Sequence, residues 1–198
     1  MMGRTALLII DMQCDFAKPG GKLYVKDGES TIPIIKELLE MARRNDLPVV
    51  YSVDAHFNPD PEFETWPLHC VAGTPGAEIV EELLPDFDRG EILIRKGSFE
   101  YSAFAPEFRE ESHLTRLLQD RKVERLVVTG LAYDFCAGST ACDGTKAGFE
   151  VYLVSEATKA VDIVSEGVST RKAMDERLQS VGVKIVSLEE ARELLKAI

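Results

Sequence analysis

The sequence lacks the features that mark membrane-spanning, secreted and nucleic-acid-binding proteins. No apolar run approaches the roughly 18 residues that a membrane span needs, and the first run ends at Asp11, which is too short for a secretory signal. Basic residues number 23 against 34 acidic ones, and the formal net charge of −11 opposes binding to nucleic acid or anionic lipid. We therefore expect a cytoplasmic protein with no nucleic-acid or membrane partner.

Disulfide and common cofactor motifs are also missing. The four cysteines include no Cys-x-x-Cys pair, and 198 residues can form a core without disulfides, so we expect free thiols. The Cys and His spacing matches no zinc finger, and G-x-G-x-x-G, the Walker A pattern and G-x-S-x-G are all absent. The usual sequence evidence for dinucleotide-binding enzymes, P-loop NTPases and serine hydrolases of the α/β-hydrolase type is therefore absent.

Short β-branched apolar runs alternate with longer amphipathic segments, a pattern typical of repeated βαβ units. It predicts a single domain, residues 1–198, with an α/β fold: three layers, with a doubly wound, mostly parallel six-stranded sheet and helices on both faces. The predicted strands are Thr5–Ile10, Pro48–Val53, Ile92–Ile94, Arg125–Thr129, Val151–Val154 and Val183–Val186. The predicted helices are Pro33–Arg44 capped by Ser30 or Thr31, Gly76–Leu84, His113–Asp120, Phe135–Ala147, Val168–Ser180 and a last helix through Lys196 that starts at a Ser187–Glu190 capping box.

Polar residues follow four of the predicted strands, at the edge where open α/β sheets bind ligands. Asp11 follows the first strand, Asp54 and His56 the second, Lys96 the third, and Cys136 lies beyond the fourth at a helix start. Taken singly, such a carboxylate is as often a cap or salt-bridge partner, and a lone cysteine is more often a small core residue. Because the strand ends share one edge, we expect these side chains to converge.

Cys136, Asp11 and Lys96 together suit nucleophilic catalysis. A helix N-terminus lowers the pKa of a thiol, which favours Cys136 as a nucleophile. Asp11 would take the thiol proton, and Lys96 would hold that carboxylate ionised. Cys142, six positions further along the same helix, is expected to fill the interface between sheet and helix instead.

Asp54, His56 and His69 offer one carboxylate and two imidazoles, a set that suits Zn, Fe or Mn with open coordination positions. The alternative is that both imidazoles only hydrogen-bond loop carbonyls, the commoner fate of a single loop histidine. Glu62 lies in the same loop and would add a ligand or, more commonly for a glutamate, stay solvated. His113 is expected to be exposed.

Several stretches of the chain, taken together, are specific to one family: Ala6–Phe16 (ALLIIDMQCDF), Val53–His56 (VDAH), Trp66–Gly76 (WPLHCVAGTPG), Lys96–Gly97, Tyr101–Phe104 (YSAF), and Gly130–Cys136 (GLAYDFC) with Thr140–Ala141. In these stretches the chain resembles the nicotinamidase group of the isochorismatase-like cysteine hydrolases, along nearly its whole length up to about Val186. Cys136 with Asp11 and Lys96 carries most of the resemblance.

The resemblance implies a role for each candidate residue. The implied catalytic residues are Asp11, Lys96 and Cys136; the implied metal ligands are Asp54, His56 and His69, holding one divalent transition metal, Zn first and Fe or Mn as alternatives. It further implies oxyanion-hole N–H groups from Ala132 and Cys136, a cis bond between Leu131 and Ala132, and Phe16 and Trp66 flanking a planar ring. Because the family is usually dimeric or larger, a homo-oligomer is expected.

The implied reaction is hydrolysis of nicotinamide to nicotinate and ammonia through a thioester. Ala55 stands where nicotinamidases commonly have Trp, and the segment Asp54–His69 is shorter than is usual for them. The loop Lys96–Tyr101 is also short, as in hydrolases of small carbamoyl or ureido amides such as N-carbamoylsarcosine amidase. That activity, metal-assisted or metal-free, is the first alternative. A non-catalytic thiol or metal-binding protein is the alternative from another class. True isochorismatases lack the cysteine, so Cys136 argues against isochorismatase activity.

Overall fold

A computed structural model of the chain describes residues 4–106 and 113–196. Its centre is a six-stranded sheet in the order β3-β2-β1-β4-β5-β8, with every pair of neighbours parallel. The strands are β1 (Arg4–Ile10), β2 (Val49–Asp54), β3 (Ile92–Lys96), β4 (Val123–Gly130), β5 (Glu150–Val154) and β8 (Lys184–Val186). This order confirms the predicted doubly wound parallel sheet.

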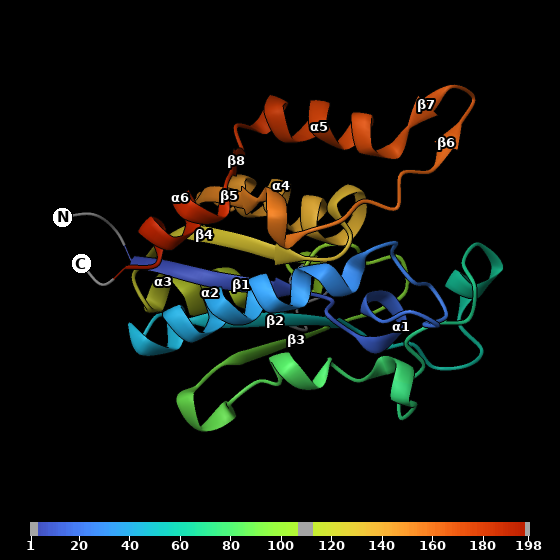
Figure 1. Ribbon diagram of the computed structural model, residues 1–198, viewed down its shortest axis with the longest axis horizontal. Helices are drawn as coiled ribbons and strands as arrows, with labels where there is room; N and C mark the ends of the chain where they lie inside the picture. The colour runs from blue at the N-terminus through green and yellow to red at the C-terminus, as the bar shows by residue number, and fades with distance from the viewer. Residues whose placement is uncertain (1–3, 107–112, 197–198) are drawn as a thin grey trace.

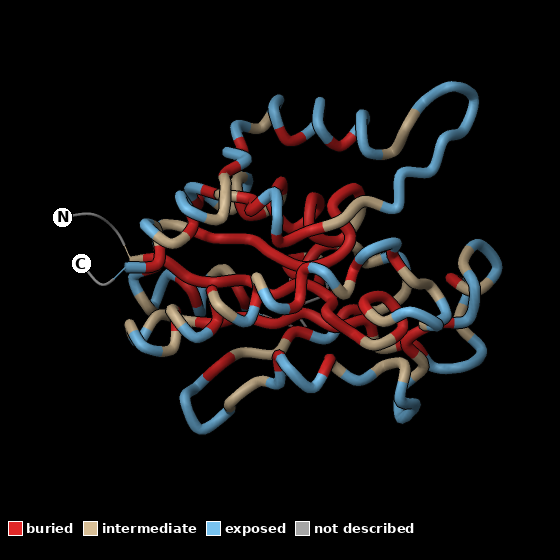
Figure 2. Tube along the Cα trace, in the orientation of Figure 1, coloured by how far each residue is buried: buried red, intermediate tan, exposed pale blue. Residues whose placement is uncertain are grey.

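Helices cover both faces of the sheet (Figure 1). One face carries α1 (Cys14–Ala17), α2 (Ile32–Arg44) and α6 (Leu188–Leu194); the other carries α3 (Leu114–Asp120), α4 (Gly138–Lys146) and α5 (Thr170–Val181). In β1, Leu7 and Ile9 pack into the first layer, whereas Leu8 and Ile10 pack into the second. From Thr5 to Ile10, β1 is therefore buried on both sides, and β4 is buried from Leu126 to Gly130, as the red central strands of Figure 2 show.

The helix predicted over Gly76–Leu84 is wrong. That segment holds two single 3-10 turns, Pro75–Ala77 and Glu81–Leu83. Between them, Ile79 forms an isolated antiparallel bridge with Gln13, and the backbone N–H of Val80 donates to the carbonyl of Met12 at 2.9 Å. These backbone bonds to the segment after β1 hold the chain extended, and they override its helical pattern.

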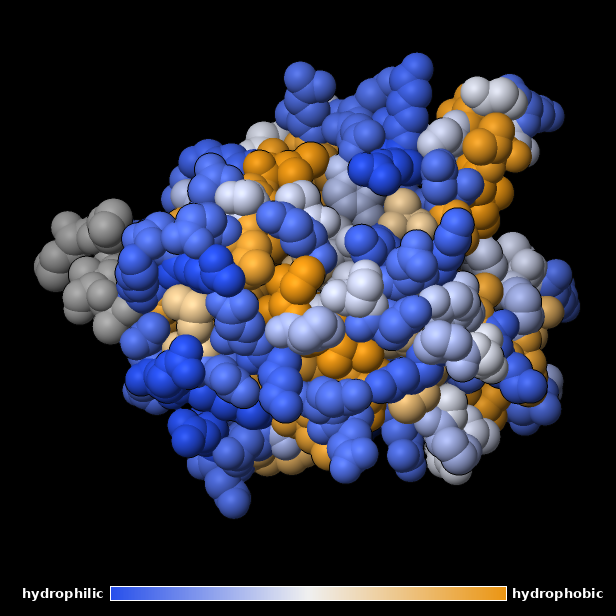
Figure 3. Space-filling model, viewed as in Figure 1, coloured by the Kyte–Doolittle hydropathy of each residue, from blue (hydrophilic) through white to orange (hydrophobic). Residues whose placement is uncertain are grey.

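The helix predicted from Val168 begins two residues later, at Thr170. Val168–Ser169 forms strand β7, which pairs with β6 (Val164–Ser165) in an antiparallel hairpin. Gly167 has a φ of +79°, as the turn requires, and the Ser169 side chain caps α5 by accepting the N–H of Lys172. The hairpin projects from the body at the upper right of Figure 1, where Figure 3 shows a group of orange, apolar side chains. Val164 and Val168 of the hairpin are exposed.

Other helix ends differ in smaller ways. Neither Ser30 nor Thr31 caps α2, because their hydroxyls donate to the carbonyls of Asp27 and Gly28 in a preceding 3-10 turn. The capping box at Ser187 is present, and α6 ends at Leu194. A π-helical turn, residues 133–137, precedes α4 where an α-helix from Phe135 is predicted. Among the described helices, none combines the length and apolar character that crossing a membrane requires.

Gly130 generates a stability prediction, because it ends β4 against β1 with a φ of +102° and a Cβ there would lie 2.0 Å from the carbonyl oxygen of Ile10. We expect Gly130→Ala to lower the free energy of unfolding by about 3 kcal/mol or more, since backbone strain adds to a collision with a central strand. Gly148→Ala is the matched control: its φ is +94° with nothing within 4 Å, so strain alone applies, about 1–2 kcal/mol. Equal losses in urea denaturation would contradict this account.

Candidate active site

The carboxyl ends of neighbouring strands bring the predicted chemical groups together. Asp11 directly follows β1, Asp54 ends β2, Lys96 ends β3, and Cys136 lies in the π-helical turn after β4. Asp54 and Lys96 are partners in the register of β2 and β3, so they are neighbours across the sheet. All four side chains are buried. The convergence expected from the strand ends is present.

The Lys96 ammonium group lies at the centre of this cluster. Its Nζ is 2.7 Å from Asp11 Oδ2 and 3.5 Å from Cys136 Sγ, and it donates to Asp54 Oδ1. A further bond, at 3.0 Å, goes to the carbonyl of Glu100. Lys96 is 1% exposed, and a cation so buried requires partners of this kind. One buried cation thus joins the thiol, the carboxylate beside it and Asp54.

The electrostatics correct one expectation about the thiol. Burial raises the pKa of Cys136 well above its usual value; Lys96 opposes the rise, while Asp11 and Asp54 add to it. Burial likewise raises the pKa of Asp11 against the attraction of Lys96. The prediction that a helix N-terminus lowers the thiol pKa is therefore wrong, because desolvation and two nearby carboxylates outweigh the helix end. The Asp11 carboxylate lies within 4.8 Å of the Cys136 sulfur.

Two side chains that the sequence patterns did not indicate orient the carboxylates. The Ser52 hydroxyl donates to Asp11 Oδ1 at 2.7 Å. Gln13, fully buried, fixes the backbone of Asp54: its Nε2 donates to the Asp54 carbonyl at 2.9 Å, and its Oε1 accepts the Asp54 N–H at 2.8 Å. The sequence signal that could have indicated Gln13 is its polar amide within the otherwise apolar segment after β1.

Asp54, His56 and His69 form a compact set of ligand atoms, all within 4.8 Å of one another. The Nε2 atoms of His56 and His69 lie 3.8 and 3.9 Å from Asp54 Oδ2. Each ring uses Nδ1 elsewhere: His56 with Asp60 Oδ2 at 3.0 Å, and His69 with the carbonyl of Pro67 at 2.7 Å. His56 Nε2 is buried with no hydrogen-bond partner among the described residues. An unpartnered, buried ring nitrogen beside a carboxylate and a second imidazole fits a transition-metal ion.

Glu62 differs from the solvated glutamate that was expected. It is 4% exposed, accepts the N–H of Phe99, and its carboxylate lies within 4.8 Å of ligand atoms of His56 and Asp60. Asp60 was missed altogether, although it orients His56 and caps the turn through the Glu62 N–H at 2.8 Å. The cis bond between Asn58 and Pro59 lies just before this turn.

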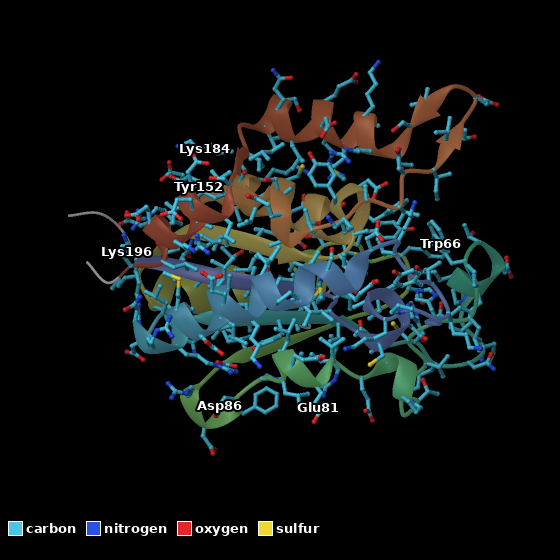
Figure 4. All side chains as sticks on the ribbon, in the orientation of Figure 1. Trp66, Glu81, Asp86, Tyr152, Lys184 and Lys196 are labelled. Atoms are coloured by element: carbon cyan, nitrogen blue, oxygen red, sulfur yellow. The ribbon has the colours of Figure 1, made fainter. Side chains whose placement is uncertain are left out.

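An aromatic-walled pocket opens beside the thiol and the histidines. Phe16, Trp66, Phe135 and Tyr101 line it. The Trp66 ring meets Phe135 edge-on at 5.3 Å between centroids, and its Nε1 donates to the Tyr101 hydroxyl at 3.3 Å. Phe16 contacts the His69 ring at 5.4 Å. Figure 4 labels Trp66 at the end of the molecule where this pocket lies. Such walls suit a flat ring.

The turn that carries Cys136 has the backbone geometry that the family resemblance implies. The bond between Leu131 and Ala132 is cis, and both residues line the pocket with Cys136. The Ala132 carbonyl accepts the N–H groups of Phe135 and Ala137 at 3.1 and 3.0 Å. Cys142 is fully buried among the helices on the second face, as expected, and His113 is exposed.

Comparisons with known proteins agree with this fold. The family model described as Isochorismatase domain matches residues 5–190. A nicotinamidase from Acinetobacter baylyi is 32% identical over 207 residues, covering 92% of this chain and 92% of that protein. A Pyrococcus horikoshii pyrazinamidase in complex with zinc has a TM-score of 0.79 at 33% identity, covering 93% of this chain and 99% of that one. PnC1 of L. infantum in complex with nicotinate has a TM-score of 0.78 at 32% identity, covering 96% and 94%.

The two charges beside Cys136 should shift its reactivity in opposite directions. Lys96→Met removes the cation that lowers the thiol pKa, whereas Asp11→Asn removes a carboxylate that raises it. At a pH below the thiol pKa, raising that pKa by about one lowers the thiolate fraction about tenfold. We expect iodoacetamide labelling of the Cys136 peptide at about pH 8, followed by mass spectrometry, to slow in the first variant and accelerate in the second. If the labelling rate falls in both folded variants, or rises in both, the opposite effects assigned to Lys96 and Asp11 on the Cys136 pKa are wrong.

Metal affinity should depend on pH through His56. Burial disfavours its charged form, but the nearby carboxylates of Asp54 and Asp60 raise the pKa of His56 to about 8. A metal ion must displace that proton, so affinity for Zn²⁺ should fall by at least about tenfold from about pH 7 to about pH 6. Asp60→Asn, which removes one of the carboxylates that raise the pKa, should flatten this dependence. Competition with a chromophoric chelator measures it, and an affinity that does not change with pH would refute the proposed role of His56.

Proposed function

This chain belongs to the isochorismatase family, and from the geometry of its pocket we propose that it is a cysteine hydrolase that converts nicotinamide to nicotinate and ammonia. One observation carries the proposal: Lys96 Nζ lies 2.7 Å from Asp11 Oδ2 and 3.5 Å from Cys136 Sγ, and Cys136 lines an aromatic pocket. A nucleophile, a proton acceptor and a cation meet where a planar amide fits.

The first half-reaction uses Asp11 as the general base. As the Cys136 sulfur forms a bond to the amide carbon, its proton passes to the Asp11 carboxylate, which the Ser52 hydroxyl orients. The carbonyl oxygen gains negative charge, and we assign its stabilisation to the backbone N–H groups of Ala132 and Cys136. When the C–N bond breaks, the proton on Asp11 goes to the leaving nitrogen, and ammonia departs from a thioester.

The second half-reaction reverses the proton path. Asp11, again ionised, takes a proton from a water molecule that adds to the thioester carbon, and the Cys136 thiol leaves with a proton. Lys96 remains charged throughout, because its pKa lies well above the usual lysine value: the cost of burial is outweighed by Asp11 and Asp54. It holds the thiol and carboxylate in place and offsets the negative charge that moves between them.

Asp54, His56 and His69 would hold one divalent transition metal, with Zn the first choice and Fe or Mn as alternatives. Bound there, the ion supplies an open coordination position for a lone-pair donor such as a pyridine nitrogen. Phe16 and Trp66 would flank the ring, so its carboxamide points to Cys136. The nicotinate and zinc complexes among similar structures support this arrangement.

The test is the product of the reaction. The zinc-loaded protein, given nicotinamide or N-carbamoylsarcosine, should release nicotinate and ammonia from the first, measured by chromatography and an ammonia assay. N-carbamoylsarcosine is the alternative substrate because the Lys96–Tyr101 loop is short. If the protein hydrolyses it faster than nicotinamide, the assigned function becomes hydrolysis of carbamoyl amides. No hydrolysis of either amide would leave the third candidate, a non-catalytic thiol or metal-binding protein.

Cysteine variants test the nucleophile in the same assay. Cys136→Ala should lower kcat/KM by at least about 1,000-fold, because the bond-forming atom is gone. Cys14→Ser, which changes a half-buried thiol elsewhere, should stay within about twofold of the parent. Retention of activity within about tenfold in Cys136→Ala, under about 1.4 kcal/mol of barrier, would rule out covalent catalysis through this thiol.

We also propose a cytoplasmic location and a homo-oligomer, dimer or tetramer. All four cysteines are free thiols, as a reducing compartment favours. The projecting β6–β7 hairpin exposes Val164 and Val168 at 66% and 60%, and a two-stranded hairpin alone is marginally stable in water. Light scattering after size exclusion gives the mass, and a monomer would contradict the assembly.

A further inference from the structure

A second pocket lies at the opposite end of the sheet from Cys136, at the amino ends of the strands. Arg4 begins β1, residues 47–49 lead into β2, Gly90 and Glu91 precede β3, and Arg121 comes two residues before β4; all line this pocket. In Figure 4, Asp86, the partner of Arg89 in the pocket wall, lies at the opposite end from Trp66. A strand of seven residues separates the two sites by roughly 20 Å.

Arginine dominates the charge of this pocket, although the chain as a whole carries −11. Four guanidinium groups line it, those of Arg4, Arg43, Arg89 and Arg121, against the carboxylates of Asp46 and Glu91. Their charge is permanent at any physiological pH. The lining arginines exceed the lining carboxylates by two, and Asp86, which pairs with Arg89, reduces this excess to one. Apolar lining is confined to Leu47, Pro48 and Val49, so the walls do not suit an aromatic ring.

The counter-charges leave much of this positive charge available. Glu91 is buried and neutralises Arg43, whose Nε and Nη2 donate to its two oxygens at 2.7 and 3.0 Å. Asp46 is 3.8 Å from Arg4, and its side chain is fully in solvent, where such a pair contributes little. Arg89 pairs with Asp86 at 3.2 Å, with both side chains exposed. Among the described ion pairs, only that of Arg43 supplies this pocket with a buried counter-charge.

Arg121 is the residue without an adequate partner. Its Nη1 is buried and makes no hydrogen bond within the described residues, and its Nη2 reaches only the Gly90 carbonyl at 3.5 Å. A buried guanidinium nitrogen with no acceptor is costly, and an anion supplies acceptors in the geometry that the guanidinium fork matches. This orphaned donor is independent of the charge count, and both point to an anionic ligand.

The cavity is also partly preorganised. Arg43 is held by Glu91, by the Leu84 carbonyl at 3.0 Å and by the Tyr51 hydroxyl at 3.5 Å. Arg4 is held by the Asp46 carbonyl. Side chains already fixed by protein contacts lose less conformational entropy when a ligand binds.

We propose that this arginine pocket, defined by Arg4, Arg43, Arg89 and Arg121, binds a phosphate group. A phosphate group is anionic and offers tetrahedral oxygens to several guanidinium forks, which a single carboxylate does not. The ligand is inorganic phosphate or a phosphate monoester, which share this chemistry. The site is separate from the thiol pocket and does not depend on the proposed hydrolase activity.

Titration calorimetry of the zinc-loaded protein with sodium phosphate tests the proposal, with sodium chloride at equal ionic strength as the reference. We expect saturable binding of phosphate and a higher Tm, and at least a tenfold weaker Kd in Arg121→Gln. Arg116→Gln is the matched control: it removes the same charge from an 81% exposed side chain outside the pocket, and should bind as the parent does. Arg4→Gln is a second pocket variant, should Arg121→Gln fail to fold.

Three results would overturn the proposal: no effect of phosphate beyond that of chloride, an unchanged Kd in Arg121→Gln, or, where that variant does not fold, an unchanged Kd in Arg4→Gln. An unchanged Kd would place the anion elsewhere, for example on the zinc ion. Glycerol phosphate, a phosphate monoester, distinguishes a site for phosphate monoesters from a site for inorganic phosphate. Binding as tight as that of inorganic phosphate identifies a phosphorylated metabolite as the ligand class, and binding of inorganic phosphate alone identifies the free ion.

Discussion

The buried ammonium group of Lys96 is the interaction on which the rest of the site depends. It has almost no contact with water, and its partners are Asp11, Asp54, the thiol of Cys136 and one backbone carbonyl. Removing one partner of a buried ion pair typically costs about 3–5 kcal/mol, because the remaining charge stays unsolvated. Its side-chain partners follow β1, end β2 and lie in the turn after β4. The charge balance of the site therefore depends on these strands being neighbours in the sheet.

This arrangement determines how the nucleophile is generated. Burial raises the pKa of the Cys136 thiol, Lys96 opposes the rise, and Asp11 and Asp54 add to it. A neutral thiol reacts more slowly with oxidants and alkylating reagents than a thiolate does, and in the proposed acylation its proton passes to Asp11 as the sulfur attacks the amide. Asp54 takes part in both halves of the site, because one of its oxygens accepts from Lys96 and the other faces the two histidines.

The sequence was most informative where its patterns depend on local chemistry. Six apolar runs predicted the six parallel strands, and the polar residues after them predicted which side chains meet, because carboxyl ends of parallel strands share an edge. The thiol pKa was not predictable in this way, since it depends on desolvation by the whole fold. The turns at residues 75–83 were missed because backbone bonds to the segment after β1, distant in sequence, decide their conformation.

Long-range contacts also explain the residues that were missed. Asp60, which was missed, acquires its role only when its loop folds onto His56, and Glu62, which was expected to be solvated, is buried where it accepts the N–H of Phe99. The arginine pocket gathers Arg4, Arg43, Arg89 and Arg121 from four separate parts of the chain, and no spacing rule connects them. Strand β7 was assigned to the following helix, and β6 was not predicted, because a two-residue strand is too short to show an alternating pattern.

The central claim is that an acyl group passes through the Cys136 sulfur, and partitioning with hydroxylamine tests it most directly. Nicotinamide and methyl nicotinate would form the same thioester, which water or hydroxylamine then attacks. The account predicts that both substrates give one ratio of nicotinohydroxamate to nicotinate at each hydroxylamine concentration. Ratios that differ between the two substrates, or turnover of nicotinamide in hydroxylamine without any hydroxamate, would contradict a common acyl-enzyme.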